Sequence, residues 1–450
     1  MLVIASFGYM EFLAINNWMA GRWYLADVGS IQAALQNTLR GKFMWSPFVE
    51  ANHYRYHFTP LLTALAPITL LSIYPIPLVT VYMAALALCP LPLLRIAREA
   101  GLHGALGVAM GVLFLGNHFT GSVELAYHFE SIYILLMLCT IAFAANGCGW
   151  AFWLSAVGTL MVKEDASVWC GCFAVYCMFS RDALERDRGR RLLAVAACML
   201  AVGVGIIYFV GRGSSSNASF YVERAGHLEF SAAALWSVVL LIASAGGLPV
   251  FGGRSLVLAL VPGVMLLSSY EFTRDLLYYY SYPFLPFLFF ATIHGAARVS
   301  RWFSSRGRGG VYFSYGLAAL LCGVGVVELF LPARTDGYVR LPVEITARDE
   351  YRLKVARDVL PPNAPTAIQF GLWGVTPKRD EAWQLTKKNI TAERWVFADL
   401  KSPYGMGRDE YVGLMRDLMD EVTSGSRKLL HSREDIYVVG PRIDGGKMKQ

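Results

Sequence analysis

Three consecutive charged residues, Lys163, Glu164 and Asp165, separate two short apolar segments of this sequence. An ammonium group such as that of Lys163 is a compact cation that can bind a phosphate, and the neighbouring carboxylates can support the same site. The three charges also fit an ordinary charged turn, in which Asp165 would cap the following helix. The sequence leaves both interpretations open.

A second group of polar residues follows the first apolar segment. Asp27 begins a stretch in which residues 28–40 have an apolar stripe at helical spacing. His57 follows within a polar and aromatic run. An acid beside histidines at the membrane surface indicates a site, whereas an acid at a helix start also stabilises the helix by about 0.3–1 kcal/mol. His53 and His57 are four residues apart and could share a metal ion.

Two further groups lie near the ends of apolar segments. Glu124, His128 and Glu130 precede or begin segment 129–146, and the spacing of Glu124 and His128 would place them on one helix face. Ionisable groups at membrane depth are costly unless paired, which makes them functional candidates, although a pair that ends a helix would explain them equally. Tyr282 belongs to a tyrosine run that could line a lipid or sugar groove or form an interfacial belt.

The composition indicates an integral membrane protein. Of the 450 residues, 55% are hydrophobic and 16% are charged, against about 25% charged in soluble domains. The net charge of +7 lies in loops between apolar segments, so we expect no nucleic-acid partner. All eight cysteines lie in or beside apolar segments, which argues against a disulfide framework.

The basic loops decide how many of twelve apolar segments span the membrane. Four arginine-containing loops fall on one side only if segment 58–74, which contains two prolines, lies along the surface. We therefore predict about eleven transmembrane helices plus juxtamembrane helices in an outer loop at 19–76. The arginine loops are then cytoplasmic, and the candidate residues lie on the outer face of an inner or plasma membrane.

The composition changes after residue 331. Charges become frequent, and the patterns predict helices at 347–359 and 409–424 and strands at 366–370, 395–399 and 436–439. We therefore predict a transmembrane domain at 1–331 and a small extracytoplasmic α/β domain at 332–450. The second domain has no glycine-rich phosphate loop, and its surface is a candidate contact for a protein partner.

These residues, in this order, resemble a bacterial and archaeal family of predicted membrane proteins of unknown function that is grouped with the GT-C glycosyltransferase superfamily. The resemblance covers about residues 20–300 and departs from the family pattern at Tyr127 and Phe129. It is carried by Asp27, Gly29, Gln32, Asn37, Gly41, His57-Phe58-Thr59-Pro60, His128-Phe129-Glu130, Lys163-Glu164-Asp165 and Tyr282-Pro283.

The resemblance implies a GT-C-like fold and a membrane glycosyltransferase that transfers a sugar from a polyprenyl-phosphate donor to an acceptor on the extracytoplasmic face. Asp27 would be the general base or the acid that orients the acceptor, and Lys163 would bind the carrier phosphate. A divalent metal, Mg²⁺ or Mn²⁺, would take oxygen ligands from Asp27 or Glu130. The implied catalytic residues are Asp27, His57, His128 and Glu130, and the implied substrate-binding residues are Gln32, Asn37, Arg55, Lys163, Glu164, Asp165 and Tyr282.

Two other functions stay open from the sequence. A non-catalytic subunit or scaffold of a membrane assembly could use the same fold, and it would tolerate a change at Asp27. A transporter or flippase would place polar groups near the bilayer midplane on broken helices, where Glu11 is the candidate charge. The expected partners are membrane lipids and a lipid-linked sugar in the first case, and other proteins in the second.

Overall fold

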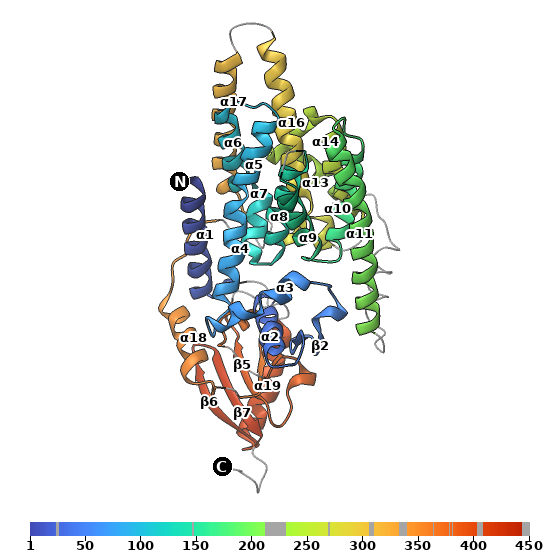
Figure 1. Cartoon of the computed structure of the whole chain (residues 1–450). Helices are drawn as coiled ribbons and strands as arrows, with labels where there is room; N and C mark the ends of the chain where they lie inside the picture. Colours follow the sequence, from blue (N-terminus) through green and yellow to red (C-terminus); the bar gives the residue numbers. More distant parts are fainter. Residues whose placement is uncertain are drawn as a thin grey trace. The chain divides into compact units, whose positions relative to one another are not determined.

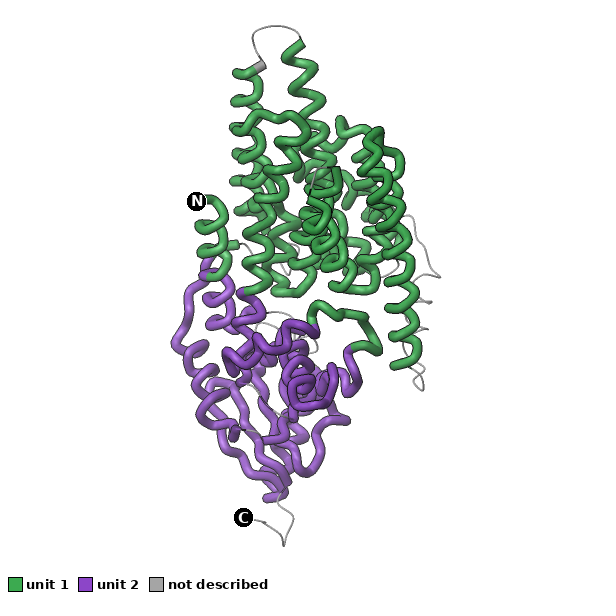
Figure 2. Tube along the Cα trace, in the orientation of Figure 1, with its two compact units in different colours: residues 1–11, 54–62, 81–341 green, residues 12–53, 63–80, 342–450 purple. Residues whose placement is uncertain are grey.

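The structure of the chain is a computed structural model, and it divides into two compact units (Figure 2). Unit 1 comprises residues 1–11, 54–62 and 81–341, and unit 2 comprises residues 12–53, 63–80 and 342–450. Unit 2 thus joins part of the predicted outer loop to the C-terminal segment. The structure describes residues 1–23, 27–145, 148–211, 231–268, 271–305, 310–332, 340–362, 364–377, 379, 381–402 and 408–442.

The long helices of unit 1 run side by side as a bundle (Figure 1). The helices are α1 (Leu2–Met19) and α4 (Ile76–Leu88), each shared with unit 2, α5 (Pro90–Glu99), α6 (Gly104–Gly116), α7 (His118–Ala126), α8 (Glu130–Ala144), α9 (Gly149–Leu160), α10 (Ala166–Met178), α11 (Ala183–Val210), α13 (Ala232–Ser244), α14 (Arg254–Leu260), α15 (Glu271–Arg274), α16 (Phe284–Ser304) and α17 (Gly310–Leu329). Short 3-10 helices η3 (Leu248–Gly252), η4 (Val261–Leu267) and η5 (Tyr278–Ser281) lie between them.

Three stretches of the described chain are long and apolar enough to cross a membrane, namely Ile76–Glu99, Ala183–Val210 and Val311–Leu329. The number rises to five if each of two bent helix pairs forms one span. Several other apolar helices are shorter, from 10 to 17 residues. The predicted number of about eleven spans therefore stays a prediction.

The two bent pairs break the regular helical backbone inside unit 1. The axes of α6 and α7 differ by 51°, and Asn117 at the break caps α7 through its side chain. The segment Glu271–Ser281 is bent by 72° from α16. Non-helical backbone among apolar helices is tolerated where protein or a water-filled cavity surrounds it, so these breaks mark places where polar groups can be presented.

Unit 2 contains a five-stranded sheet with helices packed on it. The strand order is β4-β3-β5-β7-β6, with β3 parallel to β4 and β5 and the remaining pairs antiparallel. The elements are α2 (Asp27–Leu39), β1 (Trp45–Ser46), β2 (Ala51–Asn52), η2 (Ala66–Leu70), α18 (Ala347–Asp358), β3 (Thr366–Ile368), η6 (Phe370–Leu372), β4 (Ala382–Gln384), η7 (Lys387–Asn389), β5 (Trp395–Asp399), α19 (Arg408–Thr423), β6 (Arg427–Arg433) and β7 (Ile436–Arg442).

The residue patterns of unit 2 explain its elements. A capping box at Thr346 and Asp349 starts α18 by satisfying backbone N–H groups that have no partner within the helix. Tyr411, Leu414 and Leu418 lie on the buried face of α19, at the spacing that an amphipathic helix requires. The helix therefore packs on the sheet through the cluster that also contains buried residues of β5 and β7.

Predicted and observed elements coincide where the apolar pattern is long. The predicted helices at 28–40, 347–359 and 409–424 correspond to α2, α18 and α19. Segment 58–74, expected to be one juxtamembrane helix, forms only α3 (Pro60–Ala64) and η2, because its prolines remove backbone donors. The sequence patterns do not predict α7, β4 or β6.

Candidate functional site

Three breaks in regular helical structure meet within unit 1 and bring together residues that are far apart in the sequence. They are the start of α8, the turn at 161–165 between α9 and α10, and the segment from η5 to the start of α16. A fourth piece, residues 57–61, lies against the turn, where the Leu61 N–H donates to the Met161 carbonyl at 2.9 Å. The arrangement joins seven of the predicted site residues into one network of contacts: His57, His128, Glu130, Lys163, Glu164, Asp165 and Tyr282.

Glu130 is at the centre of this network and is completely buried. The Lys163 ammonium donates to its Oε1 at 3.1 Å, and its Oε2 contacts Nδ1 of His128. Each carboxylate oxygen therefore has a partner from a different part of the chain. A buried carboxylate is tolerable only when it is paired and hydrogen-bonded in this way.

Aromatic rings complete the surroundings of Lys163. Its Nζ lies 5.8 Å from the ring centroid of Tyr279 and 5.7 Å from that of Tyr282, which is within the range of cation–π attraction. The Tyr279 ring also stacks on the His128 ring, with 4.2 Å between the ring centroids. The Tyr282 hydroxyl donates to Oδ2 of Asp165, and the other oxygen of this carboxylate is buried with no hydrogen-bond partner among the described residues.

Glu164 fastens the segment at 57–61 to the turn. Its Oε1 lies 2.9 Å from Nδ1 of His57, and its Oε2 accepts the backbone N–H of Phe58 at 2.9 Å. The two motifs His57-Phe58-Thr59-Pro60 and Lys163-Glu164-Asp165 are thereby joined by one side chain. His57 retains about a third of its side-chain exposure, so its ring can be reached from outside.

Burial and neighbouring charges set the protonation of the turn. Burial alone would lower the pKa of the Lys163 ammonium, but the negative charge of Glu130 outweighs it and the pKa is well above its ordinary value. Burial alone would raise the pKa of the Glu164 carboxyl, but His57 and Lys163 outweigh it and the pKa is lowered. Burial raises the pKa of the Asp165 carboxyl. Lys163 is therefore a cation and Glu164 an anion at neutral pH.

The backbone at the start of α8 shows why His128 points into the network. Tyr127 ends α7 in the left-handed region, with φ 52°, a conformation that costs a residue with a side chain on the order of 1 kcal/mol. The chain therefore turns between Ala126 and Glu130, and His128 is not part of α7. The prediction that Glu124 and His128 share a helix face was wrong for this reason.

Glu124 forms an ion pair with Arg340, which the sequence patterns do not predict. Nε and Nη2 of Arg340 donate to its Oε2 at 2.9 and 2.6 Å, and both side chains are almost completely buried. Arg340 also donates to the carbonyls of Leu115 and Gly116 at the end of α6. The one signal in the sequence was the buried acid itself, which requires a cation, but 216 residues separate the two.

The other predicted site residues lie elsewhere. Asp27 is the first residue of α2 in unit 2 and is half-buried. The Asn37 amide donates to the Trp45 carbonyl at 2.9 Å, so it fixes the chain after α2.

Gln32 lines a pocket of unit 2. Arg55 belongs to unit 1, and its Cζ lies 5.7 Å from the ring centroid of Tyr56. Asp165 occupies the position before α10 without making a capping bond, contrary to expectation, because its backbone is already α-helical (φ −73°, ψ −19°) and not extended as in a capping residue.

The predicted metal site finds little support at Glu130. Both oxygens of this carboxylate are already engaged, one of them by an ammonium group that a metal ion would have to displace. Within the described residues, no three His, Cys, Asp or Glu side chains are grouped so that they could hold a metal ion. A metal ion shared by His53 and His57 stays a prediction. A metal ligand role for Asp27 stays a prediction.

Comparisons with known proteins define the class. A family model described as "Predicted membrane protein (DUF2079)" matches residues 26–327, more than half of the chain, so the chain belongs to this family. It is an integral membrane protein, and the expected family resemblance is confirmed. No curated protein sequence matched the chain.

Among solved structures, the chain is similar to the crystal structure of ArnT from Cupriavidus metallidurans bound to undecaprenyl phosphate. The TM-score is 0.57, the sequence identity is 15%, and the alignment covers 97% of each chain. At this identity the likeness concerns the fold alone: the chain has a fold like that of ArnT.

Proposed function

We propose that the protein is a glycosyltransferase that uses a polyprenyl-phosphate sugar as its donor, and that Lys163 binds the phosphate of that donor. The supporting observation is the setting of Lys163 in a fold like that of ArnT, which was solved with bound undecaprenyl phosphate. Within the described residues, this buried ammonium has one hydrogen-bond acceptor, Glu130, and lies near two aromatic rings. An ammonium has three N–H donors, so donors remain for phosphate oxygens.

The proposed reaction needs charge neutralisation at the leaving group. The acceptor hydroxyl attacks the anomeric carbon, the bond from that carbon to the phosphate oxygen breaks, and the electron pair leaves with the polyprenyl phosphate. Lys163 stabilises the developing charge, and this effect is large in a site that is shielded from water. Asp27 keeps the role that the family resemblance implies, the acid that orients the acceptor or takes its proton.

The residues around Lys163 have positioning roles in this proposal. Glu130 holds the Lys163 ammonium, and His128 in turn contacts Glu130. The ring of Tyr279 lies against Lys163. Glu164 fixes the segment that carries His57. His57 is the exposed member, and we assign it a contact with the phosphate or the leaving oxygen. The proposal contains no step that requires a metal ion.

Binding and transfer can be tested separately with two variants of the purified protein in detergent. We expect Lys163→Met to weaken binding of undecaprenyl phosphate by at least tenfold, because one phosphate contact to a charged group is worth about 1.5–3 kcal/mol. We expect Asp27→Asn to retain this binding and to lose transfer of sugar from a polyprenyl-phosphate sugar. The exposed Lys388, which pairs with Glu50 in unit 2, provides the matched control Lys388→Met.

Three outcomes would contradict the proposal. Undecaprenyl phosphate that binds equally to the wild type and to Lys163→Met would remove Lys163 from the site. Full transfer by Asp27→Asn would remove Asp27 from the reaction. Binding without any detectable transfer by the wild type, across several sugar donors and acceptors, would favour a non-catalytic subunit with the same fold.

A further inference from the structure

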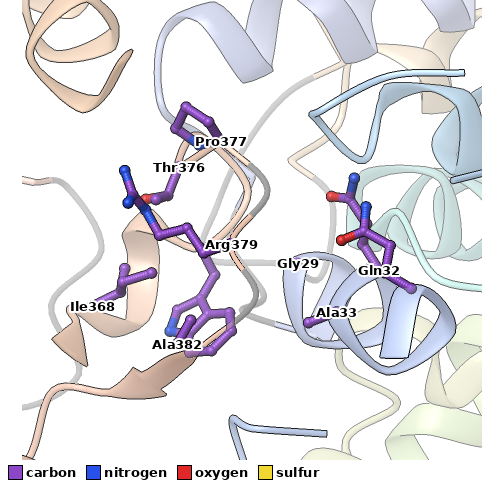
Figure 3. Close-up of a pocket in the computed structure, with 10 residues that line it drawn as sticks. Gly29, Gln32, Ala33, Ile368, Thr376, Pro377, Arg379 and Ala382 are labelled. Carbon is purple, nitrogen blue, oxygen red and sulfur yellow. The ribbon is translucent and has the colours of Figure 1, made fainter. Parts of the chain in front are cut away.

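Unit 2 contains a small pocket between α2 and the segment that follows β3. Gly29, Gln32 and Gln36 of α2 form one wall, and Trp373, Thr376 and Arg379 contribute to the other. Figure 3 shows Gln32 and Arg379 on opposite sides of this space. All of these residues belong to unit 2, whereas the network around Lys163 belongs to unit 1.

The packing of α2 against this segment is specific. A Cβ atom at Gly29 would lie 2.8 Å from the backbone carbon and oxygen of Trp373, closer than real Cβ contacts come. The glycine therefore allows α2 to approach the backbone at Trp373. Close packing fixes the two walls and makes the pocket part of the folded unit.

Four of the residues that line the pocket carry buried hydrogen-bond donors. Within the part of the chain that the structure describes, Nε2 of Gln32, Nε2 of Gln36, Nε1 of Trp373 and Nε of Arg379 are buried without a partner. Each of these four side chains is more than nine-tenths buried. An unsatisfied buried donor costs about 1–3 kcal/mol, and native proteins contain few of them, so four around one cavity require an explanation.

The charge of Arg379 points to the sign of the missing partner. Its Nη2 donates to the Leu360 carbonyl at 3.2 Å and its Nη1 to the Pro361 carbonyl, and no described acid forms an ion pair with it. Burial lowers the pKa of this guanidinium to about 10, and it still carries its charge at neutral pH. A buried cation without a counter-ion is unfavourable, and an anion in the pocket would balance it.

The size of the pocket limits what enters. The cavity volume is about 20 Å³, and a single water molecule needs about 10–15 Å³. The space suits one oxygen-rich group, not a whole sugar ring. We propose that this pocket binds a phosphate group, through the four N–H donors and the positive charge of Arg379. This goes beyond the proposed transfer reaction and does not depend on it.

The phosphate could belong to a lipid headgroup or to free inorganic phosphate, and the test distinguishes them. The full chain in detergent, carrying Lys163→Met to remove the proposed donor site, is titrated with inorganic phosphate and separately with farnesyl phosphate. We expect saturable binding of at least one of them. Binding of inorganic phosphate alone identifies the free ion, and binding of farnesyl phosphate alone identifies the lipid headgroup.

Variants of the pocket identify where the probe binds. Added to Lys163→Met, Arg379→Met and Gln36→Met should each weaken binding by at least tenfold, whereas the exposed control Lys388→Met should leave it unchanged. Arg379→Met also removes bonds to two backbone carbonyls and can affect folding. Gln36→Met loses no such bond, because Nε2 of Gln36 has no partner among the described residues. The melting temperature of this variant without phosphate should therefore be equal to or above that of the parent.

Measuring both the phosphate affinity and the melting temperature of Gln36→Met separates binding from a structural role. If Gln36 were purely structural, its replacement would lower the melting temperature and leave the phosphate affinity unchanged. A lower melting temperature of Gln36→Met with unchanged phosphate affinity would overturn the proposal. So would the absence of binding for both probes, or equal binding by the parent and both pocket variants. None of these results bears on whether Lys163 binds the sugar donor, which the variants of the preceding section decide.

Discussion

The ammonium of Lys163 lies 3.1 Å from Oε1 of Glu130, although the two residues are 33 positions apart in the sequence. Lys163 lies in the turn before α10, and Glu130 is the first residue of α8. Both side chains are buried, and Glu130 completely so. Removing one member of a buried ion pair leaves the other charge uncompensated, which typically costs 3–5 kcal/mol. The pair therefore fixes the network and also makes it sensitive to single changes.

Glu130→Gln should lower the free energy of unfolding by a few kcal/mol, because Lys163 loses its buried counter-charge. The double variant Glu130→Gln/Lys163→Met should lose less than the sum of the two single variants, with a coupling of about 0.5–3 kcal/mol. Denaturant unfolding in detergent measures this cycle. The exposed pair of Asp187 and Arg191 is the control, with an expected coupling below about 1 kcal/mol. Strict additivity at Glu130 and Lys163 would refute the pairing.

Sequence patterns could predict the candidate residues because charged groups among apolar segments are conspicuous. Lys163, Glu130 and Tyr282 were each identified from the apolar segments around them. What the sequence does not contain is the pairing, since Tyr127 leaves the α-helical region and moves His128 away from Glu124. Local patterns carry no signal for that break, because the residue is a tyrosine and not a glycine.

Long-range partners were also beyond reach. Arg340 lies in a region whose charges look like those of a soluble segment, and only the fold brings it to Glu124. The pocket of unit 2 shows the same limitation, because Gln36 and Arg379 are ordinary polar residues until burial removes them from water. In the fold, the short strands β4 and β6 were missed because three to seven residues with mixed polarity give a weak alternating pattern.

Arg340→Met should destabilise unit 1 strongly. The change leaves Glu124 buried without its cation and frees the carbonyls of Leu115 and Gly116 at the end of α6. We expect a loss of about 3–5 kcal/mol, seen as a lower melting temperature in detergent. Adding Glu124→Gln should restore part of it, because the remaining buried group is then neutral. A wild-type melting temperature for Arg340→Met would contradict the observed contacts.

Glu421 provides a test of acid sensitivity in unit 2. It pairs with Arg427 at 2.6 Å and with Arg442 at 2.5 Å, and its hydrogen bond to Arg442, then that to Arg427, lowers the pKa of its carboxyl to about 2. A carboxyl with a lowered pKa contributes stability above its unfolded pKa of about 4.5 and loses that contribution as the pH falls toward 2.

Glu421→Gln should therefore be less stable than the wild type at pH 7, by about 1 kcal/mol or less because the side chain is partly exposed. The difference should shrink as the pH falls from about 4.5 to 2. Denaturant unfolding followed across this range measures it. A difference that stays constant with pH would show that the carboxylate charge does not act through the two arginines.

The orientation of the chain can be tested by labelling. The arginine-containing loops predict that unit 2 faces outside and the start of α11 faces the cytoplasm. A membrane-impermeant maleimide applied to intact spheroplasts should label Ser424→Cys and should not label Arg190→Cys, both of which are exposed positions. After the membrane is made permeable, both should react. The reverse pattern would place unit 2 in the cytoplasm and would exclude a donor sugar on the outer face.

Close backbone packing between α6 and α17 should make Gly116 intolerant of a side chain. A Cβ atom there would overlap the Gly325 carbonyl oxygen, and backbone cannot move aside as a flexible side chain can. Small residues at helix interfaces in membranes allow this approach. Gly116→Ala should therefore cost about 1–3 kcal/mol through overpacking. Gly104→Ala, at the other end of α6 with nothing within 4 Å of its Cβ, should be neutral or stabilising by up to about 1 kcal/mol. Equal melting temperatures for the two variants would mean that α6 and α17 do not pack this closely.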